Sequence, residues 1–204
     1  MILKRGLTLY QPFAWAIAHS TKRIENRPKP CRSPDVIGCH VAIHVSTHET
    51  RKYFDWAAKL IFEKTGITVP LQHDLPHSVI VAVARFDHCV VDGEKEADQY
   101  KSDPWWIGPV GYILSDVRTL RKPIAAKGGQ GFWRLDQSTI DQIMEQVSST
   151  KPGYPTDETY DYNNGISCPN CGASVTEDLH RGFEDEDPNA EEWGGEYDVA
   201  EVKR

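Results

Sequence analysis

Apolar side chains recur at helical spacing in three segments of the chain. In "ETRKYFDWAAKLIFEKTG" they follow the i, i+3, i+4, i+7 and i+8 pattern, and Gly66 supplies a C-terminal stop. A second helix is predicted in "QPFAWAIAH", where Pro12 suits the first helical position. A third is predicted in "DQSTIDQIMEQVSS", in which Ser138 and Asp141 form a capping signature.

Strand patterns surround these predicted helices. "CHVAIHVS" alternates, so that His44 and Ser46 share the face opposite the aliphatic one. "SVIVAVARF" is apolar on both faces, which indicates a central strand. "GYILSDVRTL" and "GFWRL" are predicted as further strands, separated by the glycine-rich "AKGGQG". Because strands and helices do not alternate strictly, we predict a mixed α/β (α+β) fold, a small β-barrel or open sheet flanked by helices.

The composition changes near Thr150, where "TKPGYPTDETYDYNNG" has the Pro, Gly, Asn and Asp content of a linker. We therefore predict a domain over residues 1–148, a linker over 149–165 and an acidic, irregular C-terminal segment over 166–204. Residues 153–204 hold 14 acidic and 3 basic side chains, whereas residues 1–152 hold 16 and 20. The net charge of −7 thus resides in the C-terminal segment, and a polyanionic partner of the body is not excluded.

The hydropathy pattern also bears on location. No run approaches 18 apolar residues, and "MILKRGLTLY" lacks the apolar region and cleavage site of a signal peptide. We predict a cytoplasmic protein with no membrane partner, and the sequence leaves its oligomeric state open.

One stretch, "STKRIENRPKP", sets a single carboxylate among several cations. If it forms a strand, Glu25 and Arg27 share a face, and Lys22 can swing from the preceding turn to join Glu25. Glu25 could then accept from the exocyclic amine of a planar ligand while Lys22 and Arg27 hold phosphate or carbonyl oxygens. The alternative is a solvated strand edge with weak ion pairs.

Other candidate ligand contacts come from aromatic, polar and loop positions. Each has a structural alternative: a tryptophan pair in "DPWWIGP" can be a stacking platform or a core plug, and a strand histidine is commonly structural. The predicted nucleotide or nucleic-acid-binding set is Lys22, Glu25, Arg27, Trp15, His44, Ser46, Trp106, Lys127 and Gln130.

The C-terminal segment contains a single CxxC, Cys168 and Cys171, followed by Gly172, like the first knuckle of a zinc ribbon. A structural zinc ion needs four ligands, and no second CxxC is present. His180 or a dimer mate could complete the set; a degenerate or truncated ribbon is the alternative. If the protein holds structural zinc, we expect it in this segment, and we expect no cofactor in the main domain.

Taken in order, "LTLYQPFAWAI", "STKRIENRP", "HVAIHVS", "SVIVAVARFDHCV" and "VGYILSDVRTLRKPIAAKGGQGFWRLD" resemble the ASCH family of the PUA-like superfamily. The family signature GxKxxExR is met at Lys22, Glu25 and Arg27, with Ser20 where the family has glycine. The resemblance implies a PUA-like β-barrel with a cleft, lined by this signature, for RNA or a modified nucleobase.

In some ASCH relatives this cleft is the active site of amidohydrolases that act on acetylated cytidine, with a Lys, a Thr and a downstream Glu as catalytic residues. Lys22 matches the Lys, but Glu25 stands at the Thr position and no residue matches the downstream Glu. Ser20, Thr21 and Ser46 are the available substitutes for the hydroxyl. Three hypotheses follow: a module that binds RNA, DNA or a nucleoside; an amide-bond hydrolase in which Lys22 is catalytic; and a protein-interaction domain whose own side chains fill the cleft.

Overall fold

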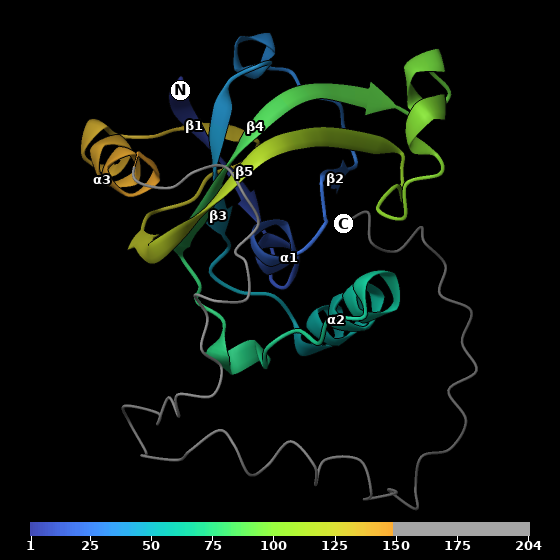
Figure 1. Ribbon diagram of the computed structural model, residues 1–204, viewed down its shortest axis with the longest axis horizontal. Coiled ribbons are helices and arrows are strands. Elements are labelled where there is room, and N and C mark those ends of the chain that lie inside the picture. Colours follow the sequence, from blue (N-terminus) through green and yellow to red (C-terminus); the bar gives the residue numbers. More distant parts are fainter. Residues whose placement is uncertain (149–204) are drawn as a thin grey trace, which may run out of the picture. The chain divides into compact units, whose positions relative to one another are not determined.

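The computed structural model describes residues 1–148 (Figure 1). Its helices and strands follow the chain in a mixed order. The elements are β1 Leu3–Leu9, α1 Phe13–His19, β2 Ile24–Arg27, the 3-10 turn η1 Pro34–Val36, β3 His40–Val45, α2 Arg51–Thr65, η2 Gln72–Asp74, β4 Val79–Val91, η3 Lys95–Tyr100, β5 Val110–Ala125, β6 Phe132–Arg134 and α3 Gln137–Val147.

The strands form one six-stranded sheet in the order β2-β5-β4-β3-β1-β6. The β1–β3 pair is parallel and the other neighbours are antiparallel. Figure 1 shows β4 and β5 as the two long strands that run side by side across the domain. This mixed sheet with flanking helices confirms the predicted fold class.

Side-chain contacts bring distant parts of the sheet together. Arg27 Nη2 on the edge strand β2 donates to the Thr8 carbonyl oxygen on β1, at 2.6 Å. Tyr112 on β5 stacks on Phe132 on the other edge strand, β6, with ring centroids 5.6 Å apart and planes 9° apart. The sheet therefore curls around its core in the barrel-like manner that the sequence predicted.

The helices follow their predicted bounds within one or two residues. Thr50 caps α2 by accepting from the Tyr53 amide, and Gly66 ends it at φ 70°, in the left-handed region that favours glycine. The predicted cap of α3 was wrong: Asp136, rather than Ser138, accepts from the Thr139 amide at 2.8 Å. The helix starts at Gln137 because Asp136, two residues before Ser138, provides the capping acceptor.

The sequence pattern missed β1, which pairs with strands on both sides. Its polar Lys4 and Arg5 break the alternation, and Gly6 lowers the strand propensity of the segment. The glycine is required by packing, because a Cβ at Gly6 would lie 2.5 Å from the Trp133 ring. Propensity at this position therefore opposes the structure that tertiary packing selects.

The three helices pack against different parts of the core. Ile143 and Val147 of α3 pack with Leu120 and Ile124 of β5. The buried Phe54 and Ile61 of α2 belong to a second cluster, together with Trp105 and with Trp15 and Ala16 of α1. The other buried apolar side chains of α1 pack in a third cluster. In Figure 1, α3 lies apart from α1 and α2. Among the described residues, no helix is both long and apolar enough to cross a bilayer.

Candidate ligand-binding site

Lys22, Glu25 and Arg27 come together at the start of β2. The strand begins at Ile24, so Lys22 lies in the preceding turn, as the sequence interpretation required. Lys22 Nζ lies 3.5 Å from Glu25 Oε2, and Arg27 Nε lies 3.3 Å from Glu25 Oε1. Because the Glu25 side chain is only 10% exposed, the solvated-edge alternative does not describe this group.

Lys22 points into the protein. It is 1% exposed, its ammonium group donates to the Ile24 carbonyl oxygen, and it lies 5.0 Å and 5.3 Å from the ring centroids of Phe13 and Trp105. Burial lowers the pKa of Lys22, while the Glu25 carboxylate acts in the opposite direction. Lys22 therefore compensates the charge of Glu25 from the interior of the protein. Arg27, whose side chain is 24% exposed, is the cation nearer to solvent.

The Glu25 carboxylate has unused capacity to accept hydrogen bonds. The Lys22 contact is at the outer limit of a hydrogen bond, and Arg27 Nε is buried without a hydrogen bond of acceptable alignment. Within residues 1–148 no short, aligned hydrogen bond to this carboxylate is formed. An ionised carboxylate offers about four lone-pair sites, and buried acceptors are normally satisfied. Glu25 thus keeps acceptor capacity beside its two ion pairs, and the neighbouring Arg27 Nε is a buried donor without a partner.

Thr8 connects this group to the glycine-rich loop. Its carbonyl oxygen accepts from Arg27, and its hydroxyl oxygen accepts from Trp133 Nε1 at 3.0 Å and from the Gly129 amide at 3.3 Å. The same hydroxyl lies 3.2 Å from His44 Nδ1. The structure thus places "AKGGQG" beside the signature, although the two stretches are about 100 residues apart in sequence.

The loop approaches so closely that position 128 requires glycine. A Cβ at Gly128 would lie 2.4 Å from His44 Cε1 and 2.8 Å from Thr8 Oγ1. Lys127 and Gln130, which the sequence predicted as ligand contacts, are exposed on this loop. They are therefore available to a ligand that reaches Arg27.

His44 is buried and both of its ring nitrogens are occupied. Nδ1 contacts the Thr8 hydroxyl, and Nε2 lies 3.0 Å from the Ala126 carbonyl oxygen. Burial lowers the pKa of His44, so the ring is held neutral, with Nε2 donating to Ala126. Ser46, next on the predicted polar face, donates to the His48 carbonyl oxygen at 3.4 Å. These contacts agree with the alternative interpretation of His44, in which a strand histidine is structural and contacts no ligand.

The tryptophans lie further inside than a stacking platform requires. Trp15 is 9% exposed and packs against His19, with ring centroids 5.4 Å apart. Trp105 is 2% exposed, and a Cβ at Gly111 would lie 2.6 Å from the ring of the half-buried Trp106. Of the two alternatives for "DPWWIGP", the loop therefore matches the core plug, with Trp105 buried and Trp106 half-buried.

The sequence interpretation missed Asn26, which fixes this loop. Its side-chain nitrogen donates to the Trp105 carbonyl oxygen at 2.9 Å, and its side-chain oxygen accepts from the Ile107 amide at 2.9 Å. Asn26 lies between Glu25 and Arg27 on β2 and points to the other side of the strand. No local sequence signal identifies such a partner, because the loop is about 80 residues away.

An aromatic group beside Glu25 was also missed. Tyr10, Phe13, Tyr53 and Trp56 contact one another where the start of α1 meets α2. Burial, with the Glu25 carboxylate as the next contribution, raises the pKa of Tyr53, so its hydroxyl stays protonated at neutral pH. The i, i+3 spacing of Tyr53 and Trp56 was the available signal, but it was used only to predict the helix.

The hydroxyls considered as substitute nucleophiles have contacts outside the signature. Ser20 Oγ donates to the Ala16 carbonyl oxygen at 2.6 Å, and Thr21 Oγ1 accepts from Trp105 Nε1 at 3.4 Å. The geometry therefore favours no hydroxyl for an amidohydrolase reaction. The predicted zinc ligands Cys168 and Cys171 lie outside the described residues.

These features define a small curled-sheet α+β domain with a charged, buried group at one edge strand. No family model and no curated protein matches the chain. Solved structures similar to it include the ASCH protein of Zymomonas mobilis, at 16% identity over 72% of this chain and 95% of that one, with a TM-score of 0.44. Two single-residue variants of that protein match at 14% identity, over 69% and 72% of this chain and 94% and 98% of theirs, with TM-scores of 0.38 and 0.39. All three are described as ASCH, the family that the sequence resembles.

Proposed function

We propose that this domain binds a nucleotide or single-stranded nucleic acid, RNA first among them, and that Glu25 accepts hydrogen bonds from the base. The observation that supports this most directly is the Glu25 carboxylate, which is buried between two cations and lacks short hydrogen bonds. A buried ion pair is weak evidence for stability alone, since apolar residues of similar volume serve equally well. A role in binding accounts for a charged group kept in such a position.

The chemistry of an ionised carboxylate selects its ligand. It accepts and never donates, so it suits the amino and ring N–H groups on the pairing edge of a base. Guanine offers two adjacent donors there, and adenine and cytosine offer an amino group each. A hydrogen bond to a charged group contributes about 1.5–3 kcal/mol, enough to discriminate between bases.

Cations next to Glu25 suit the phosphate of the same ligand. Arg27 reaches solvent beside the carboxylate, and the exposed Lys127 is carried by the loop that Thr8 ties to Arg27. Contacts of this kind position a nucleotide without reading its base. Glu25 would thus supply discrimination, and Arg27 with Lys127 would supply salt-dependent affinity.

The protein-interaction hypothesis makes a different prediction. It requires Trp105 or Trp106 to fill the site, and Trp105 does pack against Lys22 in the interior. A site filled in this way binds no nucleotide. Direct binding measurements therefore separate the two hypotheses.

The test compares wild type with Glu25→Gln and Arg27→Ala against the four nucleoside monophosphates and a short single-stranded RNA. We expect Glu25→Gln to relax discrimination between bases by about 1–3 kcal/mol, and Arg27→Ala to lower affinity for all ligands and reduce its salt dependence. Glu145→Gln, on the exposed face of α3, is the matched control because it makes the same charge change away from the site. Calorimetry between about 50 and 200 mM salt measures both effects.

Two results would contradict the proposal. One is a wild-type protein that shows no salt-dependent binding to any of these ligands. The other is a Glu25→Gln variant that remains folded and discriminates between bases as the Glu145→Gln control does.

A further inference from the structure

The aromatic group beside Glu25 has two half-exposed members. Tyr10 and Tyr53 lie with ring centroids 5.4 Å apart, Tyr53 and Trp56 at 5.6 Å, and Phe13 and Trp56 at 5.9 Å. Phe13 and Tyr53 are partly buried, whereas Tyr10 is 50% and Trp56 51% exposed. The inner pair thus holds the outer rings in fixed orientations and leaves their surfaces accessible.

This aromatic group is continuous with the Glu25 site. Phe13 lies 5.0 Å from Lys22 Nζ, which in turn contacts Glu25. Tyr53 is close enough to the Glu25 carboxylate for the two to interact electrostatically. Tyr10 and Trp56 are thus one ring removed from the neighbours of Glu25, through Tyr53 and Phe13.

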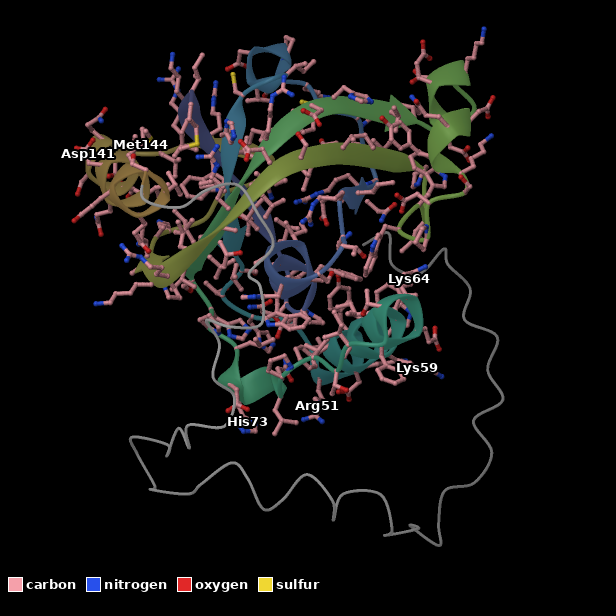
Figure 2. All side chains as sticks on the ribbon, viewed as in Figure 1. Arg51, Lys59, Lys64, His73, Asp141 and Met144 are labelled. Carbon is pink, nitrogen blue, oxygen red and sulfur yellow. The ribbon has the colours of Figure 1, made fainter. Side chains whose placement is uncertain are left out.

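The charge around the aromatic group suits a polyanion. The α2 helix carries four basic side chains, Arg51, Lys52, Lys59 and Lys64, and two acidic ones, Asp55 and Glu63. Figure 2 shows the labelled Arg51, Lys59 and Lys64 side chains around this helix. Aromatic rings next to a basic surface are the combination by which proteins bind single-stranded nucleic acid, with bases on the rings and phosphates at the cations.

We propose that Tyr10 and Trp56 stack an unpaired base adjacent to the one that contacts Glu25, so that the ligand is a single-stranded oligonucleotide of at least two nucleotides. This inference rests on the proposed function and extends it from one base to a strand. An apolar protein that docked here would remove water from the flanking lysines, which costs free energy. A nucleic acid is instead attracted to their charge.

The experiment compares a mononucleotide with an eight-nucleotide single-stranded RNA as probes. Trp56→Ala and Tyr10→Ala should each weaken RNA binding about tenfold, the effect of removing one stacked base, and leave mononucleotide binding unchanged. Phe62→Ala is the matched control, because Phe62 is 54% exposed on the same helix and lies six residues beyond Trp56. Glu25→Gln should change the binding of both probes.

The outcomes distinguish this inference from the proposed function. If wild type binds both probes but Trp56→Ala and Tyr10→Ala bind RNA as Phe62→Ala does, the stacking inference is wrong and the Glu25 site stands. If wild type binds neither probe, both are wrong. Equal losses for mononucleotide and RNA in folded variants would also overturn the inference, since they would place the rings at the first base.

Discussion

Replacement of the buried pair Lys22–Glu25 by neutral residues gives the sharpest test of how the site is built. Glu25→Gln removes the negative charge and leaves Lys22 buried at 1% exposure. Lys22→Met removes the positive charge and leaves Glu25 with Arg27 at 3.3 Å. The double variant removes both charges and keeps the volumes similar, so the three variants form a double-mutant cycle.

The expected magnitudes follow from the distances. At 3.5 Å and an effective dielectric constant of about 20, the Coulomb energy of the pair is about 5 kcal/mol. A buried charge that loses its partner costs about 3–5 kcal/mol, and Lys22 keeps the Ile24 carbonyl and two aromatic rings as partners. We therefore expect Glu25→Gln to lower the free energy of unfolding by about 3 kcal/mol, and Lys22→Met by about 1 kcal/mol.

The double variant should lose only about 1–2 kcal/mol, because no buried charge is then uncompensated. Urea unfolding followed by circular dichroism measures the four stabilities. For a domain of this size, about 3 kcal/mol corresponds to roughly 6–12 °C in Tm, so binding assays on Glu25→Gln should be run well below the wild-type transition. Additivity of the single effects within about 0.5 kcal/mol would refute the reasoning, since it would show that the two charges do not interact.

Two further predictions concern the loop and the C-terminal segment. Gly128→Ala should destabilise the domain by about 1–3 kcal/mol, because the new Cβ overlaps His44, which two hydrogen bonds hold in place. Gln130→Ala on the same loop is the control, and equal urea midpoints for the two variants would contradict the prediction. Truncation after Ser149 should strengthen RNA binding at low salt, because it removes a segment of 14 acidic and 4 basic residues that competes with the nucleic acid. The gain should shrink as salt rises, and equal affinities across a salt series would count against the prediction.

The sequence predicted best where the local pattern and the tertiary structure agree. The α2 helix has apolar periodicity, a threonine cap and a glycine stop that act within the helix itself. The meeting of Lys22 and Glu25 was likewise predictable, because it depends only on where a strand begins and on the alternation of side chains. Interactions over three residues need no knowledge of the rest of the chain.

The remaining features of the site depend on contacts that no local pattern encodes. Strand β1 has weak propensity and exists because β3 and β6 pair with it. His44 was assigned to a polar face, but the loop that contains Gly128 covers that face and buries the ring. Thr8 acquires its role only when Arg27, Gly129 and Trp133 converge on it from three distant segments.

The position of Lys22 explains why a single carboxylate can be useful among several cations. Lys22 approaches Glu25 from the interior and is anchored by the Ile24 carbonyl, so that only Arg27 shares the solvent side of the carboxylate with a ligand. The cost of burying the carboxylate is thereby offset without occupying the side on which a base would bind. If this division is correct, Lys22→Arg should weaken binding even though it conserves charge, because the larger, forked guanidinium cannot replace an ammonium group enclosed by Phe13 and Trp105. Unchanged affinity in a folded Lys22→Arg protein would show that only the positive charge at position 22 matters for ligand binding, and that the buried position of the ammonium group does not.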